Sequence, residues 1–162
     1  MTEVLVVGVG HPDRGDDAAG WLVAERLRDR LGDRPEVEVR QLSADPAALL
    51  TVAAWDTAAH VVLVDAIVTG APPGSVEVLG PDQPLPSPRA SGTHDLDLVA
   101  TLQLARALGR VPRDLTIVGI EGVRFGVGDL PSPAVVAAAE RVAGALDGEL
   151  RARLAGAAPA SG

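Results

Sequence analysis

The residues best suited to chemistry in this sequence are carboxylates and a histidine that lie next to apolar runs. Asp16 and Asp17 follow the run Val4–Val9 after a glycine-rich turn. Asp65 ends a second apolar run, and His94 stands where a segment of helical periodicity begins. Carboxylate oxygens and one imidazole are suitable ligands for a divalent metal ion and leave positions open for water or a ligand. Such a metal can polarise a carbonyl group or generate hydroxide.

Each of these residues also has a plain structural explanation. An acidic residue in the first turn of a helix interacts favourably with the helix dipole, which would account for Asp16 or Asp17. Asp65 would simply begin a turn, and His94 would open a helix without any other task. His11, in the first glycine-rich turn, is placed where it would be able to contact a ligand.

Two kinds of apolar pattern alternate along most of the chain. Short β-branched runs are typical of buried strands, and apolar residues at three- and four-residue steps are typical of helices. The predicted strands are 4–9, 37–42, 60–65, 75–79 and 114–120. The predicted helices are 17–31, 46–55, 95–108 and 133–150. The apolar faces of the first and last helices are expected to include Trp21 and Val136.

This alternation predicts the α/β class, and a length of 162 residues fits one domain. We expect a mostly parallel twisted sheet of about five strands with helices on both faces. The domain should cover 1–154, followed by a disordered tail over 155–162. Right-handed crossovers bring the carboxyl ends of parallel strands to one edge, where Asp17, Asp65 and His94 are then expected. His60 begins a strand on the opposite edge and is interpreted as structural.

Composition excludes several classes of function. The net charge is −8 and all 14 basic residues are arginines, which argues against binding to nucleic acid. The chain has no cysteine, so disulfides, thiolate metal sites and a cysteine nucleophile are ruled out. The first residues do not resemble a signal peptide and the apolar runs are too short to span a membrane, so a cytoplasmic location is expected.

The first glycine-rich turn does not fit a nucleotide site. Gly8 and Gly10 begin a G-x-G pattern, but its third glycine is missing and Pro12 removes a backbone amide. A phosphate-binding P-loop is excluded because the chain has no lysine, and no G-x-S-x-G motif supports a serine hydrolase. No nucleotide cofactor is therefore expected, and the two glycines are interpreted as making room for a peptide or a metal-bearing loop.

Taken in order, these motifs resemble the hydrogenase maturation protease family, the endopeptidases that process the large subunit of nickel–iron hydrogenases. The family pattern begins with an apolar strand, Gly-x-Gly-Asn, an acidic pair and a glycine. Later motifs are a strand that ends in Asp-Ala, a loop histidine before a helix, a Gly-Ile-Glu segment and a Leu-Ser segment. The resemblance covers about residues 3–150, with motifs at 6–20, 61–66, 91–94, 119–122 and 130–133.

By this resemblance, Asp17, Asp65 and His94 correspond to the three family residues that bind metal. They would recognise nickel that is already loaded in the [NiFe] hydrogenase large-subunit precursor. The enzyme would then remove a C-terminal extension without a serine or cysteine nucleophile. Two roles stay open for the metal: it activates the attacking water, or it serves mainly for recognition. Asp16 would orient Asp17 or simply cap the helix.

Two departures from the family pattern stand out. His11 replaces the usual asparagine after Gly10, and Ser43–Pro46 replaces a Gly-Thr-x-Gly-like turn. The first departure leaves two roles open for His11: an added imidazole ligand that alters the metal preference, or a contact to the substrate alone. The second departure removes glycine flexibility from a segment expected to hold the substrate. Two alternatives to the protease therefore stay open: a non-catalytic, metal-recognising maturation chaperone, and a divergent small-molecule hydrolase with the same fold.

Overall fold

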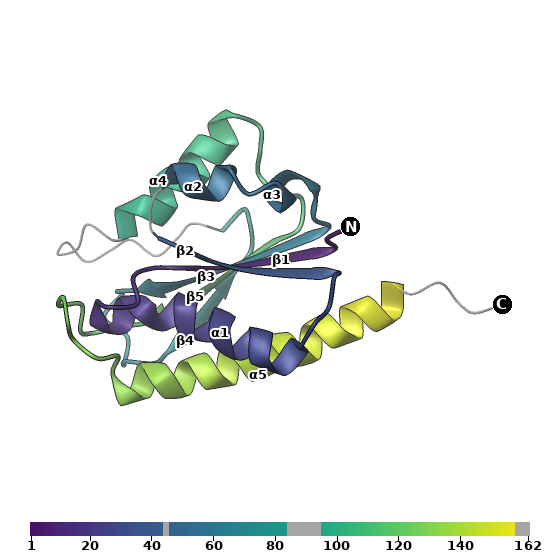
Figure 1. The fold of residues 1–162 in the computed structure, drawn as a ribbon. Helices are drawn as coiled ribbons and strands as arrows, with labels where there is room; N and C mark the ends of the chain where they lie inside the picture. Colours follow the sequence, from purple (N-terminus) through teal and green to yellow (C-terminus); the bar gives the residue numbers. More distant parts are fainter. Residues whose placement is uncertain (44–45, 84–94, 158–162) are drawn as a thin grey trace.

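The protein folds around one five-stranded sheet with helices on both faces (Figure 1). The computed structural model describes residues 1–43, 46–83 and 95–157. The strands are β1 (Val4–Val9), β2 (Val37–Leu42), β3 (His60–Ile67), β4 (Val76–Leu79) and β5 (Leu115–Glu121). The helices are the 3₁₀ turn η1 (Gly15–Ala18), α1 (Ala19–Leu31), α2 (Pro46–Leu50), α3 (Ala54–Thr57), α4 (Asp95–Ala107) and α5 (Pro133–Ala157). The predicted α/β class and mostly parallel sheet are confirmed.

The strand order is β2-β1-β3-β5-β4. All neighbours are parallel except the edge strand β4, which runs antiparallel to β5. The four parallel strands therefore end at the same edge of the sheet, on the left in Figure 1, and we call it the carboxyl edge. The loop between β5 and α5, residues 122–132, lies at this edge beside the start of α1 (Figure 1).

Alternating side chains of the strands build a core on each face of the sheet. On one face, Val62 and Val64 of β3 pack with α1 and α5. On the other face, Leu63 of β3 packs with α4 and with Trp55 of α3. The buried Trp55 indole donates a hydrogen bond to the Arg110 carbonyl oxygen at 2.7 Å, which satisfies its polar atom.

Helix α1 lies in very close contact with the sheet because glycines meet there. A Cβ atom on Gly8 would lie 2.1 Å from the carbonyl oxygen of Gly20, and one on Gly20 would lie 2.4 Å from that of Val64. Gly10 has a φ of +145°, and a Cβ there would lie 2.0 Å from the carbonyl oxygen of Asp17. The interpretation that Gly8 and Gly10 make room for a peptide or another loop is therefore wrong, since the chain's own backbone fills that space.

Several element boundaries differ from the prediction. The first helix begins with η1 and becomes α-helical only at Ala19, and the helix expected over 46–55 is divided into α2 and α3. Helix α5 continues to Ala157, so residues 155–157, expected in a disordered tail, are helical. Residues 158–162 lie outside the described part of the chain.

The expected apolar faces of the first and last helices also need correction. Trp21 is only partly buried, and its indole donates to the Leu42 carbonyl oxygen at 3.0 Å. Val135, not Val136, is fully buried at the start of α5. None of the helices in the described residues is long and apolar enough to cross a membrane.

Candidate functional site

Asp17 lies in η1, where the chain turns back over the end of β1. Its residue surface is only 3% exposed. The amide of His11 donates to the Asp17 carbonyl oxygen at 3.3 Å. Asp17 Oδ1 lies 3.6 Å from the point that a Cβ on Gly10 would occupy, so the carboxylate folds over this glycine. The turn therefore delivers a buried carboxylate to the carboxyl edge of the sheet.

Asp65 occupies the same edge on the neighbouring strand. It is 7% exposed, and its Oδ1 accepts a hydrogen bond from the Ala66 amide at 2.8 Å. Together with Leu98 of α4 and Ile117 of β5, it lines a small cavity. This contact places the Asp65 side chain on the α4 face of the sheet.

The structure thus brings two of the three predicted site residues to neighbouring strand ends. Gly8 of β1 pairs with Val64 of β3, the last pair between these two strands, and η1 contacts β3. His94 lies outside the described residues, and α4 begins at the next residue, Asp95. Within 1–43, 46–83 and 95–157, no group of three or more His, Cys, Asp or Glu residues is arranged to hold a metal ion.

The donor chemistry at this edge suits a divalent cation. Asp17 and Asp65 supply hard carboxylate oxygens from two separate elements, and both are nearly excluded from solvent. Two carboxylates alone leave most coordination positions of a divalent ion to other ligands. The described part of the site therefore fits a metal that arrives with further ligands of its own.

Asp16, next to Asp17, has a different environment. It is completely buried, and its Oδ2 accepts hydrogen bonds from the amides of Val123 and Arg124 at 2.8 and 3.0 Å. Ser132 donates its amide to Oδ1 at 2.6 Å and its hydroxyl to Oδ2 at 2.7 Å. Burial by itself raises the pKa of Asp16, but these four hydrogen bonds outweigh it and hold the pKa below its ordinary value. Asp16 therefore links η1 to a distant loop and is not a capping residue.

Glu121 is a buried acid that the sequence patterns did not single out as functional. It ends β5, is 2% exposed, and accepts hydrogen bonds from the amides of Thr69 and Gly70 at 2.8 and 3.0 Å through Oε1. The Thr69 hydroxyl donates to its Oε2 at 2.8 Å. Asp65 is a candidate site residue because it is an acid that ends an apolar run. Glu121 fits the same pattern, so this signal could have identified it.

His60 begins β3 at the edge opposite to the carboxylates, as expected. It is buried, and its Nδ1 lies 3.0 Å from Asp114 Oδ1. The second oxygen of Asp114 pairs with Arg153 of α5 at 2.9 Å. His60 thus belongs to a group of side chains that joins the start of β3 to the end of α5.

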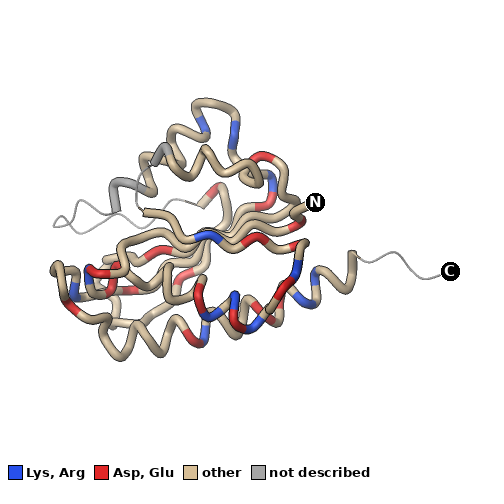
Figure 2. Tube along the Cα trace, in the orientation of Figure 1, with Lys and Arg blue, Asp and Glu red and all other residues tan. Residues whose placement is uncertain are grey.

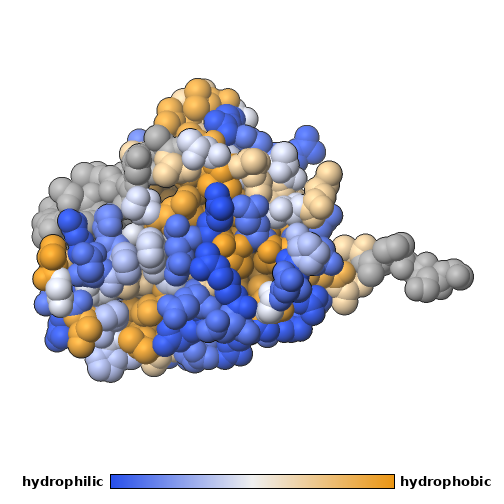
Figure 3. Space-filling model, in the orientation of Figure 1, coloured by the Kyte–Doolittle hydropathy of each residue, from blue (hydrophilic) through white to orange (hydrophobic). Residues whose placement is uncertain are grey.

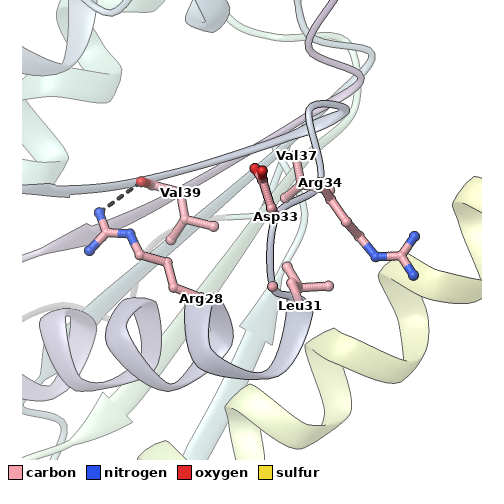
Figure 4. Close-up of a pocket in the computed structure, with 7 residues that line it drawn as sticks. Arg28, Leu31, Asp33, Arg34, Val37 and Val39 are labelled. Carbon is pink, nitrogen blue, oxygen red and sulfur yellow. Dashed lines mark hydrogen bonds between the residues drawn. The ribbon is translucent and has the colours of Figure 1, made fainter.

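A second hollow lies between the end of α1 and the beginning of β2 (Figure 4). Arg28, Asp33 and Arg34 contribute its charged side chains. The Arg28 guanidinium donates to the Val39 carbonyl oxygen at 2.8 Å. With one carboxylate and no histidine among its lining residues, this hollow does not offer the ligands of a metal site.

The surface at the carboxyl edge combines charge with apolar side chains. Figure 2 shows acidic residues at this edge as well as along α1 and α5. In the β5–α5 loop, Val123, Val127 and Leu130 expose 64%, 75% and 79% of their surface. Apolar atoms are visible at the left of the molecule in Figure 3, where this loop lies. The carboxylates are therefore bordered by a loop with three exposed aliphatic side chains.

Comparison with known proteins identifies relatives across the whole fold. The family model "Hydrogenase maturation protease" matches residues 21–146. The hydrogenase 2 maturation protease of Escherichia coli (strain K12) is 30% identical over 120 residues, 72% of this chain and 71% of that protein. The [NiFe] hydrogenase maturation protease HycI from Thermococcus kodakarensis KOD1 has a TM-score of 0.72 and 31% identity, over 93% of both chains.

A solution structure of an endopeptidase from Escherichia coli is also similar, with a TM-score of 0.74 and 26% identity over 94% of both chains. The sequence thus matches the family model, and the arrangement of the sheet and helices matches the solved structures of such proteins. This chain belongs to the hydrogenase maturation protease family.

Proposed function

We propose that the protein is an endopeptidase that removes a C-terminal extension from a nickel-loaded [NiFe] hydrogenase large-subunit precursor. The observation that carries this proposal is the family match over residues 21–146. The names of the relatives, a hydrogenase 2 maturation protease and a [NiFe] hydrogenase maturation protease, support a hydrogenase precursor as the substrate class.

In this proposal, Asp17, Asp65 and His94 contact the nickel ion of the bound precursor. Nickel is part of the substrate, and the precursor supplies the ligands that the enzyme does not. The burial of Asp17 and Asp65 supports this role, because carboxylates shielded from water attract a cation more strongly than exposed ones do. Nickel bound there acts as a Lewis acid or marks the loaded precursor for cleavage.

The proposed reaction needs no serine or cysteine nucleophile. The chain has no cysteine, and a water molecule attacks the scissile carbonyl. The buried carboxylates at the carboxyl edge orient this water and accept its proton, and they return a proton to the leaving amine as the C–N bond breaks.

The direct test is incubation of the full chain with nickel-loaded precursor, followed by intact-mass measurement. We expect loss of a C-terminal peptide with the wild type, and at least about a hundredfold slower loss with Asp17→Asn, Asp65→Asn or His94→Ala. Glu140→Gln, on the exposed face of α5, is the matched control and should cleave at the wild-type rate. Full activity in all three site variants would overturn the assignment of these residues.

Other outcomes distinguish the alternatives. Stable binding of the precursor without cleavage supports the maturation chaperone, and neither binding nor cleavage supports a small-molecule hydrolase. Repeating the assay with nickel-free precursor separates the two roles of the metal: restoration by added Zn²⁺ supports a Lewis-acid role, while a requirement for nickel alone supports recognition. His11→Asn should retain activity but change the preference among metals.

A further inference from the structure

The turn that carries Asp17 has little support of its own. η1 contains only four residues, and the residue before it, Arg14, makes no side-chain capping hydrogen bond. Short 3₁₀ turns have poorer hydrogen-bond geometry than α-helices, so their position depends on what they contact. The contacts of η1 therefore determine where the carboxylate of Asp17 lies.

The β5–α5 loop supplies many of these contacts. The Gly15 amide donates to the Asp129 carbonyl oxygen at 3.0 Å, and the Asp16 amide donates to the Arg124 carbonyl oxygen at 2.6 Å. The two backbones are so close that a Cβ on Gly15 would lie 2.3 Å from the Arg124 oxygen. Any shift of the loop is therefore transmitted directly to η1.

The carboxylate of Asp16 fixes this loop at both of its ends. Val123 and Arg124 stand at the beginning of the loop, and Ser132 stands at its end, directly before α5. The backbone of Gly122 also lies close to the Asp16 side chain, since a Cβ on Gly122 would lie 2.8 Å from the Asp16 Cβ atom. The fully buried side chain of Asp16 thus holds both ends of the loop next to Asp17.

We infer that Asp16 is a positioning residue, which fixes the β5–α5 loop against η1 and thereby sets the position of Asp17 for cleavage of the precursor. This inference rests on the proposed function. Asp16 itself contacts neither nickel nor the scissile peptide, because its carboxylate oxygens are already engaged by four donors from the loop.

The variant Asp16→Asn tests this role with almost no change in shape. Whichever way the amide is turned, at least one loop donor then faces an NH₂ group instead of an acceptor. We expect kcat for precursor cleavage to fall about 10- to 100-fold, the range for groups that orient a ligating residue, while KM changes less than about threefold. Asp129→Asn is the matched control, because the Asp129 carboxylate accepts a hydrogen bond from the Gly126 amide inside the loop and, within the described residues, makes none to η1, so kcat should stay unchanged.

Amide hydrogen exchange provides a readout that does not depend on cleavage. A positioning role predicts that Asp16→Asn speeds exchange at the loop amides of Val123 and Ser132 and also at the η1 amides of Gly15 and Asp17. A merely structural role would affect the loop amides alone. The Val64 amide, in the buried centre of the sheet, should be unaffected and reports that the fold is intact.

The outcomes separate this inference from the proposed function. If the wild type cleaves no precursor, the proposed function fails, and the exchange pattern still decides whether Asp16 positions η1. If the wild type cleaves and Asp16→Asn retains its kcat, with faster exchange confined to the loop, the inference is overturned. If Asp16→Asn does not fold, Ser132→Ala is the second variant, because it removes only the hydroxyl donor to Asp16. We expect kcat of Ser132→Ala to fall about threefold. Unchanged kcat together with unchanged amide exchange in this variant would also overturn the inference.

Discussion

Acidic residues at the carboxyl edge of the sheet and acidic residues on the helical surface are stabilised in different ways. Asp16 and Glu121 are buried and accept hydrogen bonds from backbone amides and hydroxyls of loops. Asp56 and Glu140 are on the surface and pair with arginine side chains. The buried acids therefore order backbone segments around the candidate site, whereas the surface acids join neighbouring helices and loops.

This difference has an energetic consequence. A buried donor or acceptor that loses its partner costs the full desolvation free energy of the group, whereas an exposed one forms hydrogen bonds with water instead. The carboxyl edge should therefore respond strongly to small changes in shape or hydrogen bonding, and the helical surface should respond weakly.

Glycine substitutions should show the largest contrast between the two regions. Gly20→Ala would bring a Cβ within 2.4 Å of the Val64 carbonyl oxygen, and backbone atoms have little freedom to move aside. We expect the free energy of unfolding to fall by about 3 kcal/mol or more, as measured by urea denaturation. Gly148→Ala in α5 is the control: nothing lies within 4 Å of its Cβ, and it should raise stability by about 0.5–1 kcal/mol. Equal effects of the two substitutions would contradict the contrast.

The two kinds of acid are compared directly by Glu121→Gln and Glu140→Gln. In the first variant an NH₂ group meets donors from Thr69 or Gly70 in a buried place, so the free energy of unfolding should fall by about 1–2 kcal/mol. In the second variant the exposed pairs with Arg26 and Arg30 are weakened, and no change beyond the experimental error is expected. Thermal unfolding of both variants in parallel measures these changes. A larger loss of stability in Glu140→Gln than in Glu121→Gln would contradict the comparison.

A small, pH-dependent effect is expected for the exposed pair of Asp56 with Arg110. A hydrogen bond from Arg110 is the main cause that holds the pKa of Asp56 below its ordinary value. Because the pKa is lowered in the folded state, the stabilisation is present above the unfolded pKa of about 3.9 and disappears as the pH falls through the folded value. The urea midpoint of Asp56→Asn should therefore be slightly below that of the wild type at pH 6, and the two should converge as the pH falls through the lowered pKa of Asp56. In 1 M salt the difference at pH 6 should vanish.

Much of the fold follows from local patterns in the sequence. Val4–Val9 is an uninterrupted apolar run closed by glycine, and the structure has a strand with these bounds. Asp65 was expected at the carboxyl edge because it ends a similar run, and it lies there. Such positions can be predicted since the pattern of neighbouring residues alone determines them.

Other features depend on residues that are far apart in the sequence. Asp16 accepts hydrogen bonds from residues more than 100 positions away, and no local pattern indicates which loop meets it. The close contacts of Gly8 with Gly20 and of Gly10 with Asp17 likewise exist only in the folded chain, and the sequence pattern alone led us to interpret Gly8 and Gly10 as space for a partner. The end of α5 differs from the prediction for another reason: the small residues of 155–157 resemble a tail, although alanine is the strongest helix former.

The close contact between Gly8 and Gly20 limits how this protein can change. When two residues collide in a core, a smaller residue at one position usually relieves a larger one at the other. Here both positions already have no side chain, and the atoms that would be struck belong to the backbone. Neither glycine therefore offers the other a compensating replacement, and a selection for suppressors of Gly8→Ala should return changes elsewhere in the chain or the restored glycine.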